Sequence, residues 1–446
     1  MGGKRICVIG AGPSGLVATK TLAQAGLDAQ CFDLSPVVGG QWVIDNPNGR
    51  SAAYRSLKTN TPRRMNRFSD FPMPEDWPVF PSAAQVAEWL TSYAEAFNLA
   101  SRLHLNTEVL KATPLTDQGW IVQVRGPDGT IRDEAFDAIL VATGTYWQPR
   151  LPVFAGTFSG TLFHAQRYRD PQTPVDTAGK HVIVAGIGNT GCEIAVEMAR
   201  AGAASVTLSA RSGTWIMPKL VNGKSLSDKT PMVHPEDPVL PVFKLLPEKL
   251  HQPLFAWIAK KAIRKQFGGQ MKRMVELGLP PPPDHPFDKR PTVAQDLLAA
   301  LEAGDVQARG EILALEGREA VFADGRRAPA DVIVCATGFH LAFPFLDASL
   351  ADTAGDDLRL FRAVMSPRRH DLFFAGLGRP TGAFWPVSEV QARFAAAVLS
   401  GAYALPPQAE IDRHASGVNS GKAFNPALYA RAMRNEMRRG AARRQR

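Results

Sequence analysis

Two glycine-rich turns constrain the fold of this chain more than any other feature. The first lies in RICVIGAGPSGLVATKTLAQAG, where a short apolar run leads into Gly10, Gly12 and Gly15 and then into residues with helical spacing. In such a strand, turn and helix the first glycine makes the turn, the second lets a pyrophosphate approach and the third lets helix and strand pack closely. We therefore expect Gly10, Gly12, Pro13, Ser14 and Gly15 to bind a dinucleotide at the helix N-terminus.

The next apolar run supports this interpretation, because it ends in an acid. Asp33 lies eighteen residues beyond Gly15, and an acid at a spacing of about 20 residues hydrogen-bonds the ribose of a bound dinucleotide. We predict that Asp33 binds the unphosphorylated ribose of FAD or NAD. The alternative is a turn residue at a strand end.

The second glycine-rich turn lies in HVIVAGIGNTGCEIAVEMARAG, with Gly186, Gly188 and Gly191. The strand that follows it ends in Arg211 rather than in an acid. A guanidinium at this place pairs with a 2′-phosphate, which favours NADPH over NADH; the alternative is a surface arginine. The residues predicted to bind NADPH are Gly186, Gly188, Asn189, Thr190, Gly191, Arg211 and Ser212.

Two further apolar runs, at 136–149 and 330–345, each end a strand in Ala-Thr-Gly and predict crossings between two domains. We expect an α/β fold of two doubly wound, Rossmann-like domains, each a parallel sheet that binds its ligand at the carboxyl ends of the strands. The NADPH-binding domain, 156–292, is inserted into a discontinuous FAD-binding domain formed by 1–155 and 293–446.

Five ordered motifs, spread over residues 5–400, resemble those of the flavin-containing monooxygenases, and of their soluble bacterial members in particular. Residues 158–169, FSGTLFHAQRYR, match the family fingerprint through Phe158, Gly160, His164, Tyr168 and Arg169. The other four motifs are GGQW at 39–42, the block SLKTNTPRRMNRFSDFPMP at 56–74, ATGF at 336–339 and QAR at 391–393.

The resemblance implies an enzyme that binds FAD and NADPH, forms a flavin hydroperoxide with molecular oxygen and transfers one oxygen atom to a small soft nucleophile, an amine nitrogen or a sulfide sulfur, with indole as a further candidate. It assigns Asn60 to stabilising the oxygenated flavin, although an asparagine before Pro62 also suits a simple turn. It implies that His164 and Arg169 organise the hinge between the domains. Further cofactor-binding residues are Gln41, Trp42, Thr61, Thr337, Gly338 and Gln391.

Two other activities stay open. A related group inserts oxygen into ketones by the Baeyer-Villiger reaction, but its fingerprint ends in Trp-Pro, whereas here Tyr168 and Arg169 stand at that place. An FAD- and NADPH-dependent reductase or oxidase without oxygenation is the second alternative. A disulfide reductase needs paired cysteines, and Cys7, Cys31, Cys192 and Cys335 form no such pair at short spacing.

Charge and cysteine content exclude several other classes. The net charge of +9 is concentrated in the tail from 431 to 446, which holds seven Arg against one Glu. We predict a solvated or frayed end there, with an interaction patch as the alternative, and no nucleic-acid partner. The cysteines suggest neither disulfides nor a metal site, and no apolar stretch reaches membrane-spanning length. A cytoplasmic homodimer without a transmembrane anchor is expected.

The segment at 213–292 exceeds a minimal nucleotide-binding domain. Apolar residues recur among lysines there, and four prolines follow at 280–283. We predict a helix packed over the NADPH domain and ended by the prolines as a stiff linker. A substrate entrance or a helix lying on a membrane surface are the alternatives.

Overall fold

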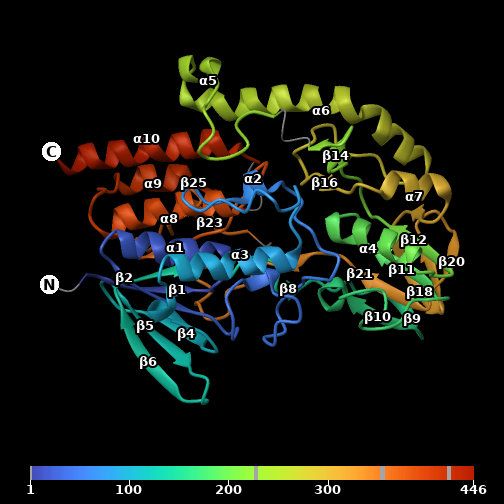
Figure 1. The fold of residues 1–446 in the computed structure, drawn as a ribbon, viewed down its shortest axis with the longest axis horizontal. Helices are drawn as coiled ribbons and strands as arrows, with labels where there is room; N and C mark the ends of the chain where they lie inside the picture. The colour runs from blue at the N-terminus through green and yellow to red at the C-terminus, as the bar shows by residue number, and fades with distance from the viewer. Residues whose placement is uncertain (1–2, 226–229, 352–356, 419–422, 446) are drawn as a thin grey trace.

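The computed structural model describes residues 3–225, 230–351, 357–418 and 423–445, so 226–229 of the 213–292 segment and 446 of the tail lie outside it. Two parallel five-stranded sheets organise the molecule (Figure 1). The first has the order β24-β7-β1-β2-β3 and the second the order β10-β21-β11-β12-β17. In each sheet the strand before the glycine-rich turn is central, which confirms the doubly wound α/β prediction.

The first sheet is built from β1 (Arg5–Ile9), β2 (Asp28–Phe32), β3 (Leu103–His104), β7 (Ala138–Val141) and β24 (Leu372–Phe374). One face carries α1 (Pro13–Gln24), α3 (Ala83–Ala96) and α8 (Trp385–Leu399) in a single apolar core. The other face packs against the antiparallel sheet of β4 (Glu108–Pro114), β5 (Trp120–Arg125) and β6 (Ile131–Phe136). Cores on both faces explain why these strands are continuously apolar.

The second sheet is built from β10 (Thr161–His164), β11 (His181–Ala185), β12 (Ser205–Ser209), β17 (Gln307–Arg309) and β21 (Val332–Cys335). Side chains alternate between its faces, because Val182 and Val184 join the core under α4 (Asn189–Arg200) and α7 (Leu297–Ala303), while Ile183 joins the opposite core. That opposite face is covered by β9 (Ala155–Phe158), β18 (Ile312–Gly317), β19 (Glu319–Phe322) and β20 (Arg327–Pro329).

The chain returns to the first unit later than predicted. Strands β17 to β21 fall between 307 and 335, inside the segment expected to belong to the FAD domain, yet they complete the sheets of the second unit. The boundary at 293 is therefore wrong, because β21 pairs with both β10 and β11. The Ala-Thr-Gly runs do mark the crossings, where β8 (Gln148–Pro149) pairs antiparallel with β22 (Phe339–His340).

The 213–292 segment bridges both units. Helix α6 (His251–Glu276) runs along the top of Figure 1, and Phe267, Met271 and Met274 in its second half are buried in the core of the second unit. This confirms the predicted packing. Its first half and α5 (Pro241–Leu245) lie instead beside α10, where Phe243 is buried against Ala427 and Leu428. After α6 the prolines at 280–283 pass along Trp215, whose indole N–H donates to the Pro283 carbonyl at 2.9 Å.

The arginine-rich tail is helical and packed. Helix α10 (Pro426–Arg444) lies against α8, and its Glu436 is fully buried among Arg362, Arg439 and Arg443. The end is therefore not frayed, because the Glu436 carboxylate gives part of the basic run a counter-charge inside the protein. It is solvated in part, as predicted, because Arg434, Arg438, Arg439 and Arg444 are exposed. Within the described ranges, no helix combines the length and apolar character needed to cross a bilayer.

The remaining short elements connect these layers. They are α2 (Arg63–Asn66), α9 (Gln408–His414), β13 (Ile216–Met217), β14 (Leu220–Val221), β15 (Lys224–Ser225), β16 (Thr292–Val293), β23 (Arg359–Phe361) and β25 (Ala415–Gly417), with short 3₁₀ turns at Gly40–Trp42, Ala100–Arg102, Ala165–Arg167 and Glu248–Leu250.

Candidate active site

A single cavity of about 860 Å³ connects the two glycine-rich turns and both crossings. Its walls come from the first unit, from the second unit and from the segment around 287–293, so it lies where the units meet. The structure brings the following predicted residues to its surface: Gly10, Gly12, Pro13, Ser14, Asp33, Gln41, Trp42, Asn60, Thr61, Gly188, Asn189, Thr190 and Gly338.

The other predicted residues lie behind or outside this surface. Gly15 packs beneath the turn of Gly10, and Gly186 and Gly191 pack together in the same way. Gln391 is fully buried, where it accepts a hydrogen bond from the Gly376 N–H and donates to the carbonyls of Ala363 and Leu377. The Thr337 hydroxyl donates to the Arg150 carbonyl and ties the two crossings together. Arg211 and Ser212 are exposed just beyond the end of β12.

The first turn is shaped to receive an anion. Gly10 has φ +107°, and a Cβ there would lie 2.7 Å from the Ala142 carbonyl oxygen, so only glycine fits. The backbone N–H groups at the start of α1 then open toward the cavity. The Asp33 carboxylate beside them accepts hydrogen bonds from the N–H of Ala11 at 2.5 Å and of Ser35 at 2.7 Å. Burial raises the pKa of Asp33, and these two hydrogen bonds oppose that rise.

The second turn repeats this geometry and leaves more room. Gly188 is the N-cap of α4, and a Cβ built on it would meet no atom of the described residues within 4 Å. Asn189 is held in place because its Oδ1 accepts a hydrogen bond from the Val293 N–H at 2.7 Å. Space at a helix N-terminus that no side chain fills suits a bound pyrophosphate.

Several polar atoms around the cavity have no hydrogen-bond partner among the residues that the structure describes. Buried side chains nearly always find hydrogen bonds, yet four that line this cavity lack one: Thr59 Oγ1, Asn60 Oδ1, Thr143 Oγ1 and Trp147 Nε1. A bound group with its own donors and acceptors would satisfy them. Together with the open space at Gly188, this fits a site built for dinucleotide cofactors.

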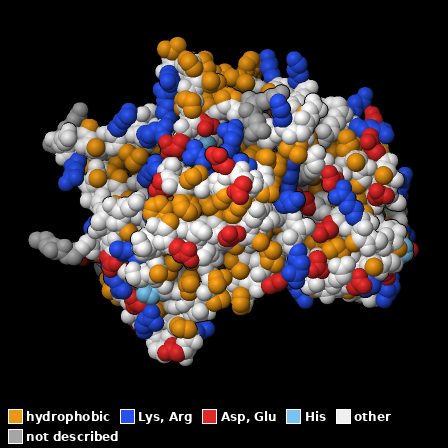
Figure 2. Space-filling view, in the orientation of Figure 1, with side chains coloured by type: hydrophobic (Ala, Val, Ile, Leu, Met, Phe, Trp, Pro, Cys, Tyr) orange, Lys and Arg blue, Asp and Glu red, His pale blue; other side chains and the backbone are white. Residues whose placement is uncertain are grey.

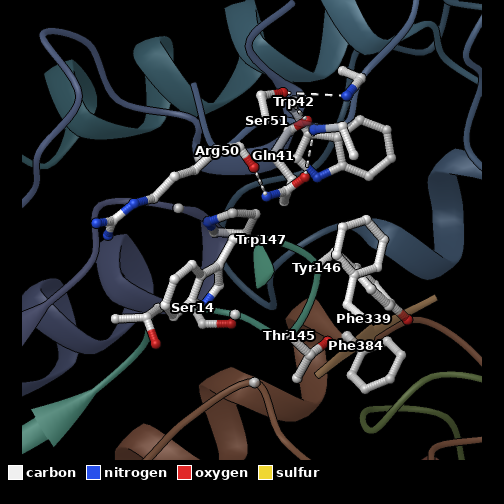
Figure 3. Close-up of a pocket in the computed structure, with 18 of the residues that line it drawn as sticks. Ser14, Gln41, Trp42, Arg50, Ser51, Thr145, Tyr146, Trp147, Phe339 and Phe384 are labelled. Atoms are coloured by element: carbon white, nitrogen blue, oxygen red, sulfur yellow. Dashed lines mark hydrogen bonds between the residues drawn. The ribbon is translucent and has the colours of Figure 1, made fainter. Parts of the chain in front are cut away.

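The wall around the predicted Gln41 and Trp42 is held rigidly (Figure 3). The Gln41 amide donates to the Arg50 carbonyl at 2.8 Å and accepts from the Ala52 N–H at 2.9 Å. Trp42 packs edge-on against Trp385 with ring centroids 5.2 Å apart. These contacts fix the two side chains before any ligand binds.

The turn that carries Asn60 is also braced. The Thr61 hydroxyl donates to Asn66 Oδ1 at 2.8 Å, and Asn66 Nδ2 returns a hydrogen bond to the Thr61 carbonyl at 2.7 Å. These hydrogen bonds to Asn66 fix Thr61, whereas the Oδ1 of Asn60 is available to accept a hydrogen bond from a ligand.

One part of the site was missed from the sequence. Tyr146, Phe339 and Phe384 form an aromatic wall (Figure 3), and Arg290 donates to the Tyr146 hydroxyl and lies 5.1 Å from the Phe384 ring centre. Lys289 lies next to it and donates to Ser212 Oγ at 2.6 Å. No motif surrounds Lys289 and Arg290 in the sequence; the phenylalanine of ATGF was the one available pointer.

The fingerprint at 158–169 joins the two units, as the resemblance implied. His164 Nε2 donates to the Gly338 carbonyl at 2.9 Å, while its Nδ1 accepts from the Gln166 N–H at 3.1 Å. Burial lowers the pKa of His164, so the ring is neutral with both nitrogens occupied, which suits a structural role rather than a base. Arg169 reaches Asp45 and the Ser51 carbonyl in the first unit.

A Cβ on Gly160 would lie 2.5 Å from the backbone carbonyl oxygen of Asp331, which explains the glycine of the fingerprint. The four cysteines do not take part in the chemistry of the cavity, because all of them are buried elsewhere and none lines it. Burial raises the pKa of each of them, which keeps the thiols protonated.

Comparison with known proteins agrees with this geometry. A family model described as flavin-binding monooxygenase-like matches residues 3–427. The chain is 32% identical over 419 residues to dimethylaniline monooxygenase [N-oxide-forming] 2 of Macaca mulatta, covering 91% of this chain and 75% of that protein. Two solved structures share the fold. The S-allyl-L-cysteine S-oxygenase from Allium sativum has TM-score 0.68 at 21% identity, covering 97% of this chain and 88% of that one.

The second structure is the NADP+-bound cyclohexanone monooxygenase from Rhodococcus sp. Phi1, with TM-score 0.69 at 18% identity and 98% of both chains covered. At these identities the two structures are evidence for the fold only. The family is shown by the family model, which matches nearly the whole sequence. The predicted resemblance is confirmed: this chain belongs to the flavin-binding monooxygenase-like family and is a flavoprotein monooxygenase that uses FAD and NADPH.

Proposed function

We propose that the enzyme oxidises NADPH and transfers one atom of molecular oxygen to a soft nucleophile, an amine nitrogen or a sulfide sulfur. The observation that carries this proposal is the continuity of the cavity from the turn at Gly12 to the turn at Gly188. A hydride can then pass from NADPH to FAD inside the cavity, without contact with bulk water. Two similar proteins support the same substrate chemistry: one is named as an N-oxide-forming monooxygenase and the other as an S-oxygenase of S-allyl-L-cysteine.

We assign the first turn to FAD and the second to NADPH. The amides at the start of α1 and the Asp33 carboxylate suit the pyrophosphate and ribose of FAD, with Gln41, Trp42 and Thr61 on the same side of the cavity. The open space at Gly188 suits the pyrophosphate of NADPH. We infer that its 2′-phosphate binds at the edge of the cavity, between Arg211, Ser212 and Lys289, because Lys289 lines the cavity and already reaches the Ser212 hydroxyl.

When bound, the nicotinamide supplies a hydride and the flavin, once reduced, supplies the chemistry that activates oxygen. The residues of this chain must exclude water and hold polar groups in place. We propose that Asn60 does so with a neutral amide, since its unpartnered Oδ1 neither adds charge nor releases a proton. Tyr146, Phe339 and Phe384 form an apolar wall on which an uncharged substrate can rest.

The test is a substrate screen with purified protein. N,N-dimethylaniline, methyl phenyl sulfide and cyclohexanone are each supplied with NADPH, while product, NADPH and hydrogen peroxide are measured together. We expect N-oxide and sulfoxide in proportion to the NADPH consumed. Lactone as the main product would favour the Baeyer-Villiger alternative, and NADPH consumed with peroxide alone would contradict oxygen transfer.

A homodimer in the cytoplasmic compartment remains a prediction. Light scattering of the purified enzyme tests the first part, since a mass close to that of one chain would contradict it. Fractionation of the native host, with a soluble marker enzyme for comparison, tests the second part.

A further inference from the structure

The charged side chains around the cavity are unevenly distributed. Among the described residues that line it, the acids are Asp33 and Glu108, both from the first unit. Backbone N–H groups of the first turn hold Asp33, and Glu108 forms ion pairs with Arg50 at 3.4 Å and Arg125 at 3.2 Å. The remaining lining cations lie away from these acids, beside the aromatic wall: Lys289, Arg290 and Arg379.

Arg290 and Arg379 lie together, and we call them the arginine pair. Arg290 donates to the Tyr146 hydroxyl and lies 5.1 Å from the Phe384 ring centre. Arg379 Nη2 donates to the Phe287 carbonyl at 3.1 Å, in the same segment as Arg290. Burial and then the charge of Arg290 lower the pKa of Arg379, so the two guanidinium groups are near enough to repel one another. Arg290 is exposed, which places the pair at the mouth of the cavity.

The charge of this pair is not balanced by an acid on the cavity wall. Arg290 forms no ion pair within the described ranges. Asp288 partly offsets the charge of Arg379, but it is exposed and does not line the cavity. On the face of the molecule seen in Figure 2, by contrast, Lys and Arg side chains lie interspersed with Asp and Glu. The mouth therefore combines excess positive charge with an apolar aromatic wall.

We propose that the arginine pair selects substrates that carry an anionic group, so that this enzyme prefers a sulfide with a carboxylate to an amine. This inference rests on the proposed function. An aliphatic amine is protonated at neutral pH, and its charge would be repelled at the mouth. A sulfide is uncharged, and a carboxylate attached to it matches the planar donor set of a guanidinium.

The substrate would then bind with its carboxylate at the arginine pair, its ring against Tyr146 and Phe384 and its sulfur pointing inward, toward Asn60. One atom of oxygen passes to the sulfur, which becomes a sulfoxide. The other atom leaves as water, with the hydride of NADPH and one proton. No further reactant is needed, so the arginine pair changes which substrate is accepted and leaves the reaction itself as proposed above.

Three sulfides that differ mainly in charge test this proposal. They are para-(methylthio)benzoate, methyl phenyl sulfide and para-(methylthio)benzylamine, each supplied at saturating NADPH while sulfoxide is measured. We expect kcat/KM to be about tenfold higher for the anion than for the cation, and this ratio to fall at high salt. Arg290→Gln and Arg379→Gln should each lower the ratio severalfold, whereas Arg379→Lys, which keeps the charge, should retain it. Differences in intrinsic reactivity cancel when variants are compared.

A binding measurement separates this proposal from the proposed function. Titration calorimetry of the holoenzyme uses para-methylbenzoate and para-methylbenzylamine, which carry no sulfur and are not oxygenated at that position. We expect the benzoate to bind about tenfold more tightly than the amine, and Arg379→Gln to remove this difference. The same preference without sulfoxide from any sulfide would support the anion site while contradicting the proposed function.

Arg438→Gln on α10 is the matched control, because Arg438 is exposed, forms no ion pair within the described ranges and does not line the cavity. It removes the same charge from the molecule and should leave both ratios unchanged. Equal binding of the benzoate and the amine by the wild type overturns the proposal. So does a raised KM for NADPH in Arg290→Gln and Arg379→Gln with an unchanged ratio, since it would assign the arginine pair to the cofactor.

Discussion

Gly191 packs so closely beneath Gly186 that a Cβ added to Gly191 would lie 2.0 Å from the Gly186 carbonyl oxygen. Gly188, between them in the same turn, would carry a Cβ that lies more than 4 Å from every atom in the described part of the chain. One glycine is therefore required by the packing of helix on strand, and the other leaves space that the protein does not use. The two can be separated by experiment.

We expect Gly188→Ala to fold normally and to weaken NADPH binding. Its φ of −71° suits alanine, and its methyl group would occupy the space assigned to the pyrophosphate. The KM for NADPH should rise roughly tenfold or more, which corresponds to ~1.4 kcal/mol, with urea unfolding unchanged. Gly191→Ala should instead lower the free energy of unfolding by about 2 kcal/mol, because the clash is with backbone. Equal KM values in wild type and Gly188→Ala would refute the assignment.

Much of this architecture could be predicted because it is encoded locally. A glycine-rich turn, the strand before it and the helix after it are adjacent in sequence, so both nucleotide units were found from short motifs. The crossings at Ala-Thr-Gly were found for the same reason. The domain boundary at 293 failed because β21 joins its sheet between β10 and β11, a pairing over more than a hundred residues that no local pattern reports.

The residues missed in the site depend on such distant pairings. Lys289 meets Ser212 across 77 positions, and Arg290 meets Tyr146 across 144. The packing of the tail was missed for a related reason. The high positive charge of the tail predicts a solvated segment. That Glu436 is buried among its arginines follows from the three-dimensional structure and not from the composition.

Arg211 should determine the preference of the enzyme for NADPH over NADH. Losing its charged hydrogen bonds to a phosphate costs about 1.5–3 kcal/mol. We therefore expect Arg211→Ala to raise the KM for NADPH roughly tenfold or more and to leave that for NADH nearly unchanged. Steady-state kinetics with both cofactors measure this ratio, and Arg200→Ala on α4 is the control for a surface arginine. An unchanged NADPH to NADH ratio would show that Arg211 does not bind the 2′-phosphate.

Asn60 should control how tightly NADPH oxidation is coupled to oxygen transfer, rather than the binding of the cofactors. We expect Asn60→Ala to keep its flavin and to oxidise NADPH, because no fold contact of the Asn60 amide oxygen is lost. The share of NADPH that ends as hydrogen peroxide should rise severalfold, since water gains access where the amide stood. Product and peroxide are measured together against NADPH. Asn435→Ala on α10, at a residue that does not line the cavity and whose side chain donates to Glu248, is the control. A fully coupled Asn60→Ala enzyme would refute the role.

Glu436 gives the tail a pH-dependent role in stability. Its carboxylate is fully buried and accepts hydrogen bonds from Arg362, Arg439, Arg443 and the Tyr403 hydroxyl at 2.7–2.9 Å. Burial alone raises the pKa of Glu436, but hydrogen bonds from Arg443, Tyr403 and Arg439 and the charge of Arg362 outweigh it and lower the pKa to about 2. The ionised form is thus favoured more strongly in the folded state than in the unfolded one.

A carboxyl whose pKa falls on folding stabilises the protein above its unfolded value, here 4.5, and loses that contribution as the pH falls through its folded value of about 2. Glu436→Gln should lower the free energy of unfolding by about 3 kcal/mol at neutral pH, since it removes a buried carboxylate whose ionised form three arginines stabilise. The difference from wild type should shrink between pH 4.5 and pH 2. Urea unfolding across this range measures it, with Glu95→Gln on the exposed face of α3 as control. A loss in Glu436→Gln that stays constant over that range would show that the charge of Glu436 does not stabilise the fold.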